Sequence, residues 1–270
     1  MQEDQTAIQK KLANFFLRMS TVQVRALLLD YDGTLAPFRT DPATAIPYPG
    51  VREVLQRIKG CERSKVILVS GRRAQKVSQL LGVDDIEIWG CHGMEHLSST
   101  GVLETTKPDS RTSEALASVR GGFVDRGLTE FIEDKPTGHA VHWRGLAADR
   151  AGSIRLAGEA VWSETADKDV LRILHFDGGI EICASAMNKG DVVRLIAAGL
   201  GDSHAMAYLG DDVTDEDAFL ALRGIGLGGI GLSVLVREAS RDTNADVWIR
   251  PPDDVIEFLD RWEQACQNHF

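Results

Sequence analysis

The sequence predicts an α/β protein, with a doubly wound, Rossmann-like core on a parallel sheet and a smaller inserted α+β domain. Three observations lead to this prediction. Apolar runs alternate with helical periods from residue 24 onward, and the same alternation returns after residue 188. The segment between them has shorter stretches that alternate residue by residue. Parallel strands buried on both faces read as apolar runs between helices, whereas antiparallel strands with one solvated face alternate.

The individual elements follow in chain order. Residues 1–20 are acidic first and amphipathic after, which predicts a helix. The core then alternates strand and helix in the stretches VRALLLD, PGVREVLQRIKG, SKVILVSG, RRAQKVSQLLGV and IEIWGCHG. It resumes with helix and strand in turn in KGDVVRLIAAGLG, HAMAYLGDD, TDEDAFLALRG, GIGLSVLV and PDDVIEFLDRWEQA. Between the halves, FIEDKPTGHAVHWRG and LRILHFDGGIEICAS predict antiparallel strands with a helix between them. We therefore expect a core domain at 1–101 and 188–270 and an inserted domain at 102–187.

Composition narrows the class of protein. The 270 residues, 43% of them hydrophobic, suffice for two domains with separate cores. Forty acidic against thirty basic residues give a net charge of -10, so no nucleic-acid partner is expected. No apolar run approaches the ~20 residues of a membrane span, and the N-terminus does not resemble a secretory signal. The cysteines lack the spacing of metal sites or disulfide frameworks. We expect a cytoplasmic protein with reduced thiols and no membrane partner. The oligomeric state is left open, with a monomer favoured.

Acidic side chains follow two of the expected strands. Asp30 and Asp32 come at the end of LLLDYD, and Asp211 and Asp212 follow MAYLG. The carboxyl ends of parallel strands form the edge where ligands bind, so these acids should gather there. Acids this close ionise together only beside a compensating cation, and hard oxygen ligands favour Mg²⁺ over zinc. The sequence therefore predicts a magnesium site.

Two further residues extend this site toward phosphate chemistry. Ser70 follows the strand KVILV, and Lys189 opens a helix, where its charge is mildly unfavourable unless an anion lies nearby. A metal, a cation and a hydroxyl together can hold the oxygens of a phosphoryl group. One carboxylate can then attack phosphorus while the second acts as acid and then as base.

Four motifs in this order resemble those of the haloacid dehalogenase superfamily of phosphatases: DYDGT at 30–34, SGR at 70–72, Lys189 in NKGD and GDDVTDEDAF at 210–219. More narrowly, the chain resembles the trehalose-6-phosphate phosphatase family. That resemblance is carried by DYDGTLAPF, GCHGMEH, GDDVTDEDAF, EDK…HWR and IEICASAMNKG, and it covers most of the chain. It implies a Mg²⁺-dependent phosphatase that hydrolyses a sugar phosphate monoester through an aspartyl-phosphate. Trehalose 6-phosphate is the leading substrate that the resemblance implies.

The resemblance also implies a role for each site residue. Asp30 would be the nucleophile and Asp32 the acid and base. The metal ligands would be Asp30, the main chain of Asp32 and Asp211. The phosphate-binding residues would be Ser70, Gly71, Arg72 and Lys189. In the inserted domain, acting as a cap, the sugar contacts would be Glu133, Lys135 and Glu181. Read from the residues alone, those three side chains fit a solvated strand face equally well.

Other interpretations of single residues stay open. Asp30 and Asp32 could cap an Asp-Gly turn, and Ser70 could cap the helix that follows it. Asp215 fits a first-turn acid that favours a helix start, or an acid that reaches the metal through water.

Other functions stay open as well. The substrate could be another glycosyl phosphate, such as mannosyl-3-phosphoglycerate, sucrose 6-phosphate or glucosylglycerol phosphate. A catalytically silent sugar-phosphate sensor, or a regulatory partner of a synthase, is the alternative outside enzymes.

Two motifs are set aside. HGMEH at 92–96 matches a zinc-peptidase pattern that needs one helical face, but Gly93 and the flanking strand argue against a helix. GIGLGG at 224–229 matches a dinucleotide fingerprint, but it follows a helix and precedes a strand, the reverse of the required context.

Overall fold

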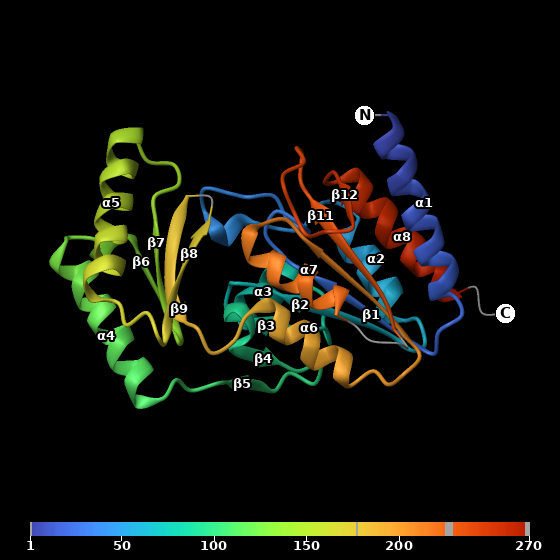
Figure 1. Ribbon diagram of the computed structural model, residues 1–270, viewed down its shortest axis with the longest axis horizontal. Helices are drawn as coiled ribbons and strands as arrows, with labels where there is room; N and C mark the ends of the chain where they lie inside the picture. Colours follow the sequence, from blue (N-terminus) through green and yellow to red (C-terminus); the bar gives the residue numbers. More distant parts are fainter. Residues whose placement is uncertain (1, 177, 225–228, 268–270) are drawn as a thin grey trace. The chain divides into compact units, whose positions relative to one another are not determined.

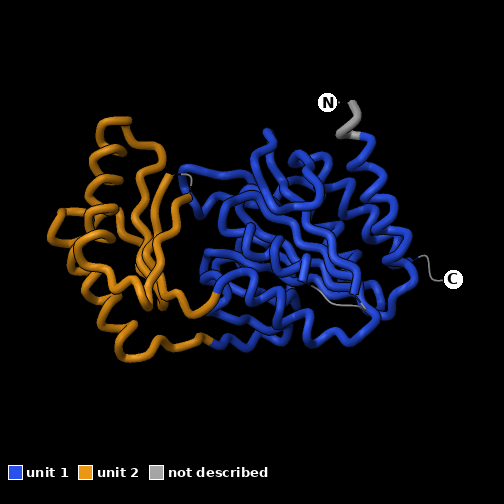
Figure 2. Tube along the Cα trace, in the orientation of Figure 1, with its two compact units in different colours: residues 1–104, 188–270 blue, residues 105–187 orange. Residues whose placement is uncertain are grey.

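The computed structural model describes residues 2–176, 178–224 and 229–267. The chain divides into two compact units, residues 1–104 with 188–270 and residues 105–187 (Figure 2). The larger unit is an α/β structure on a largely parallel sheet, which confirms the predicted fold class. Most of the GIGLGG stretch lies outside the described residues. Among the helices that are described, none has the length and apolar character to cross a bilayer.

Within the described residues, the sheet of the larger unit has eight strands in the order β12-β11-β10-β1-β2-β3-β4-β5. Its strands are β1 (Val24–Leu29), β2 (Ser64–Val69), β3 (Glu87–Gly90), β4 (Glu95–Leu97), β5 (Leu103–Thr105), β10 (His204–Gly210), β11 (Gly229–Val236) and β12 (Val247–Ile249). Strand β1 pairs in parallel with β10 on one side and with β2 on the other, so Leu28 lies between Tyr208 and Ile67. Strands from the N-terminal and C-terminal parts of the chain therefore pair at the centre of the sheet.

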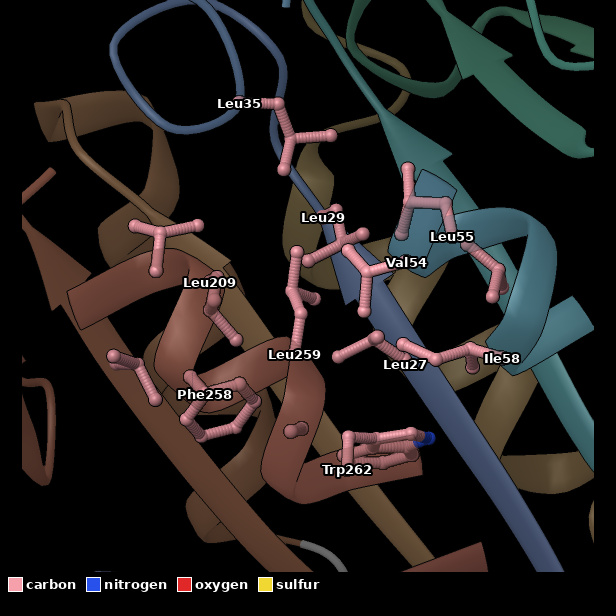
Figure 3. Close-up of a cluster of buried hydrophobic side chains, with 14 of the residues drawn as sticks. Leu27, Leu29, Leu35, Val54, Leu55, Ile58, Leu209, Phe258, Leu259 and Trp262 are labelled. Carbon is pink, nitrogen blue, oxygen red and sulfur yellow. The ribbon is translucent and has the colours of Figure 1, made fainter. Parts of the chain in front are cut away.

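Helices cover both faces of this sheet (Figure 1). They are α1 (Gln2–Met19), α2 (Val51–Lys59), α3 (Ala74–Leu81), α6 (Lys189–Ala198), α7 (Glu216–Arg223) and α8 (Asp253–Gln267). Figure 3 shows Leu27 and Leu29 of β1 packed with side chains of α2 and α8, and α1 and α3 belong to the same buried cluster. On the opposite face, Tyr208 of β10 meets Phe219 of α7 edge to ring. Burial on both faces explains why these strands are continuous apolar runs.

Local turns set where several elements begin and end. The strand β3 stops at Gly90 because Cys91 and His92 adopt positive φ angles of 48° and 57°. The helix expected from residue 214 begins later, because Asp212 and Asp215 form a capping box around the 3₁₀ turn Val213–Asp215. The short strands β4, β5 and β12 carry too few residues for a recognisable sequence pattern.

As far as its residues are described, the smaller unit is a four-stranded antiparallel sheet in the order β6-β7-β9-β8, with two helices on one face. Its elements are α4 (Ser110–Asp125), β6 (Ile132–Lys135), β7 (Gly138–His142), α5 (Ala148–Thr165), β8 (Leu171–Phe176) and β9 (Gly179–Ala184). Ile180 and Ile182 pack toward α4 and α5, so the residue between them, Glu181, points to the other face. A side chain at Gly122 of α4 would crowd Val161 of α5 at 3.1 Å, and the glycine permits the close helix contact.

Candidate active site

The turn after β1 brings two acidic segments into contact. Asp30 directly follows the last residue of β1 and is 5% exposed. Gly33 has a φ of +79°, and a Cβ at this position would lie 2.2 Å from Oδ2 of Asp211. Only a residue without a side chain can adopt this turn and leave room for the Asp211 carboxylate. The glycine of DYDGT therefore permits the approach of the loops after β1 and β10.

Three buried carboxylates meet there. Asp30, Asp211 and Asp215 each offer an oxygen atom, and these oxygens lie within 4.8 Å of one another. Lys189, the first residue of α6, donates hydrogen bonds of 2.7 Å to Oδ1 of Asp30 and to Oδ1 of Asp215. The Tyr208 hydroxyl donates to Asp215 at 2.6 Å. We name these three acids with Lys189 the acidic cluster.

The electrostatics of the acidic cluster favour a further cation. Burial raises the pKa of Asp30 to about 7, in spite of Lys189, and the negative charge of Asp215 adds to the shift. Burial, and after it the charges of Asp30 and Asp215, raise the pKa of Asp211 well above its ordinary value. One ammonium group thus faces three carboxylates. Hard, buried oxygen donors in excess of the local positive charge fit a divalent cation such as Mg²⁺.

Asp215 belongs to the site more directly than an acid in the first turn of a helix would. Its side chain is fully buried, and its Oδ2 accepts hydrogen bonds from the backbone N–H groups of Asp211 and Asp212 at 3.1 and 3.0 Å. It thus caps its own turn and, through Oδ1, joins the acidic cluster. The capping-box spacing of Asp212 and Asp215 was the available sequence signal, but it could not show that the turn folds back onto β10.

Ser70, Gly71 and Arg72 form a tight turn after β2. Ser70 is buried, and its Oγ accepts a hydrogen bond from the Arg72 backbone N–H at 3.1 Å. A Cβ on Gly71 would lie 2.6 Å from Cε1 of the His92 ring, so a side chain here would displace that ring. The side chain of Arg72 is paired with Asp32. The Asp32 carboxylate is thus paired with an arginine. Asp32 is close to Asp30 in the sequence, but it is not one of the three carboxylates of the acidic cluster.

The three residues expected to contact a sugar lie on one face of the smaller sheet. The register places Glu133, Ala140 and Glu181 side by side across β6, β7 and β9. Lys135 donates to Glu181 at 2.5 Å, with both side chains less than a tenth exposed. His142 pairs with Glu133 at 2.8 Å, and this hydrogen bond, aided by Lys135, lowers the pKa of Glu133. They form a charged face opposite α4 and α5.

The HGMEH stretch does not form a metal-binding helix. Its residues lie on a 3₁₀ turn and on β4. Glu95 is fully buried and accepts from the Ala74 backbone N–H at 2.8 Å and from Arg73 at 3.1 Å, at the start of α3. The His96 ring stacks on Trp89 with centroids 4.3 Å apart. These side chains support packing between β3, β4 and α3.

Solved structures define the class of this fold. The C-terminal domain of a trehalose-6-phosphate phosphatase from C. albicans superposes with a TM-score of 0.81 at 24% identity, over 94% of this chain and 96% of that one. A haloacid dehalogenase-like hydrolase from B. subtilis has a TM-score of 0.60 at 14% identity, over 87% and 98% of the two chains. The fold is that of the haloacid dehalogenase-like hydrolases.

Sequence comparison narrows this class. Residues 28–249 match the family model Trehalose-phosphatase. The trehalose-phosphate phosphatase of Mycobacterium marinum is 32% identical over 89% of this chain and 62% of that protein. Probable trehalose-phosphate phosphatase 4 of Oryza sativa is 29% identical over 86% of this chain and 64% of that protein. The chain therefore belongs to the trehalose-phosphatase family, and it spans less than two thirds of the length of these two relatives.

Proposed function

We propose that this protein hydrolyses a sugar phosphate monoester, trehalose 6-phosphate, to trehalose and phosphate through an aspartyl-phosphate on Asp30. The observation that carries the proposal is the acidic cluster of a trehalose-phosphatase family member, in which Lys189 bonds Asp30 at 2.7 Å in a buried setting. A lysine held against a nucleophilic carboxylate can compensate the charge of an incoming phosphate.

We assign Mg²⁺ as the cofactor. Asp30, Asp211 and the main chain of Asp32 would hold it, and Asp215 supplies the third carboxylate of the cluster. When bound, the ion would neutralise charge on the phosphoryl oxygens and on the carboxylates. Ser70 and Gly71, in the turn after β2, would contact the phosphoryl group together with Lys189.

The protein's own residues can perform both halves of the reaction. In the first half, an oxygen of Asp30 bonds to phosphorus, the ester P–O bond breaks, and its electron pair leaves with the sugar oxygen, which takes a proton from Asp32. In the second half, Asp32 takes a proton from water as the water oxygen bonds to phosphorus. The P–O bond to Asp30 then breaks, which releases phosphate and restores both acids.

The smaller unit would recognise the sugar. We propose that the inserted domain acts as a cap and that Glu133, Lys135 and Glu181 bond sugar hydroxyls. Their gathering on one face of the smaller sheet supports this role, because charged side chains that lie side by side can bond several hydroxyl groups of one polyhydroxyl ligand. We further propose that the enzyme acts in the cytoplasm as a monomer on this small-molecule substrate, without a nucleic-acid partner, in line with its net charge of -10.

A substrate panel tests the proposal. Phosphate release is measured from trehalose 6-phosphate, glucose 6-phosphate, sucrose 6-phosphate and glycosyl phosphoglycerates, each with Mg²⁺ and with chelator. A strong Mg²⁺-dependent preference for trehalose 6-phosphate is expected. Preference for another ester would replace the substrate and the sugar contacts, and silence on every ester would support a sugar-phosphate sensor instead.

A further inference from the structure

The guanidinium of Arg72 grips the carboxylate of Asp32 with two hydrogen bonds. Nε donates to Oδ2 at 2.5 Å and Nη2 donates to Oδ1 at 2.6 Å. Both side chains are largely sheltered, with 20% and 25% of their surface exposed. A two-bond arginine–carboxylate pair determines the plane and the direction of the carboxylate, which one bond from a lysine cannot do.

Arg72 is itself held in place by its surroundings. Its Nη1 donates to the carbonyl of Pro42 at 2.9 Å, and its guanidinium lies 5.9 Å from the centre of the Tyr31 ring. Tyr31 is fully buried, and its hydroxyl donates to the carbonyl of Ala45 at 2.7 Å. The loop after β1 therefore supports Arg72 at two points, and Arg72 transmits this support to Asp32.

From this geometry we infer that Arg72 is a positioning residue: it aims the Asp32 carboxyl group at the leaving-group oxygen and at the attacking water, instead of binding the transferred phosphoryl group. This inference rests on the proposed function, in which Asp32 is the acid and base. A carboxylate has about four lone-pair positions and the guanidinium uses two of them, so proton exchange remains open on the others.

The quality of the leaving group separates the two roles of Arg72. A sugar alkoxide needs a proton as it leaves, whereas the nitrophenolate of p-nitrophenyl phosphate leaves without one. The value of kcat/KM reports the steps up to release of this first product. Replacing Arg72 by Met should lower kcat/KM for trehalose 6-phosphate by about 100-fold or more, the usual contribution of a positioned general acid, and lower it for p-nitrophenyl phosphate by less than about 10-fold.

Two control variants test whether the loss arises from the Arg72–Asp32 pair. Arg73→Met removes the adjacent arginine, which bonds Glu95 and not Asp32, and should change the ratio of the two kcat/KM values by less than about 3-fold. In an Asp32→Asn background, Arg72→Met should cause no further loss with trehalose 6-phosphate, because two residues that act through one group are not additive.

The inference is overturned if Arg72→Met lowers both kcat/KM values equally, since this would place the guanidinium on the phosphoryl group, or if it lowers neither. Arg72→Lys, with a thermal melt of each variant, decides the matter if the Met variant does not fold: a selective loss with the sugar ester supports positioning, and an equal loss opposes it. Failure of the proposed function is a separate result, in which the wild-type protein releases no phosphate from trehalose 6-phosphate. The comparison is then made with whichever sugar ester it hydrolyses.

Discussion

At the scale of single residues, the acidic cluster holds more negative than positive charge. Asp30, Asp211 and Asp215 share one ammonium group, that of Lys189, and burial raises the pKa of both Asp30 and Asp211. Buried carboxylates in this number cost free energy unless a bound cation compensates their charge. Shifted pKa values of this kind are typical of functional sites.

Replacing Asp30 by Asn should lower phosphate release from trehalose 6-phosphate by at least about 10⁴-fold, because the amide cannot form the acyl-phosphate bond. The fold should remain, since Lys189 keeps its 2.7 Å bond to Asp215. Phosphate release and a thermal melt check both statements. The exposed neighbour variant Asp41→Asn serves as the control and should retain activity. Turnover by the Asp30→Asn protein would eliminate Asp30 as the nucleophile.

Replacing Gly33 by Ala should destabilise the protein by about 2–5 kcal/mol, because the Cβ meets Asp211 at 2.2 Å in a left-handed conformation. Gly101→Ala is a matched control: its φ is +84°, but no atom lies within 4 Å of the added Cβ. It should cost only about 1–2 kcal/mol. Urea denaturation midpoints give the difference, and equal losses would show that the contact with Asp211 carries no cost.

At the scale of elements, segments with a strong apolar pattern were predictable, whereas three-residue strands and a helix with a weak pattern were not. The helices α2 and α8 have one apolar side, and the central strands are continuous apolar runs, so both types could be recognised. The three-residue strands β4, β5 and β12 and the helix α4 were not among the expected elements. The helix α4 packs closely on α5 at Gly122, a tertiary contact that no local pattern of residues indicates.

Replacing Trp262 by Ala on α8 should cost about 3–5 kcal/mol, because the ring is fully buried in the core cluster drawn in Figure 3. The KM for the substrate should stay within about 2-fold, since α8 lies in the core and supplies no residue of the acidic cluster. Leu17→Ala on α1, a position 71% exposed, should cost less than about 0.5 kcal/mol. Equal stability of the two variants in urea would contradict the assigned packing.

At the scale of the whole molecule, the site unites segments that are far apart in the chain. Asp30 and Lys189 are separated by 159 positions, yet their side chains bond because β1 pairs directly with β10 and α6 precedes β10. A ligand that binds such a site stabilises the folded state, because the unfolded chain cannot assemble it.

Mg²⁺ should therefore stabilise the wild-type protein, by about 2.7 kcal/mol at a concentration one hundred times its Kd. Asp211→Asn removes a carboxylate of the cluster and should abolish most of this gain, whereas Asp253→Asn, at the start of α8, should keep it. Melting temperatures measured with Mg²⁺ and with chelator provide the test without reliance on activity. A gain that is unchanged in Asp211→Asn would place the cation elsewhere.

The sequence by itself determined the α/β class, the order of the main elements and the residue types that follow the central strands. These features could be predicted because apolar runs and helical periods are visible in short stretches of the sequence. It also indicated that Asp30, Asp211 and Lys189 should gather at one sheet edge. Only the tertiary structure decided that Asp215 joins them, that Tyr208 bonds it, and that Arg72 grips Asp32. The physical reason is that these contacts depend on how turns fold back across neighbouring strands, and no local pattern of residues encodes that direction.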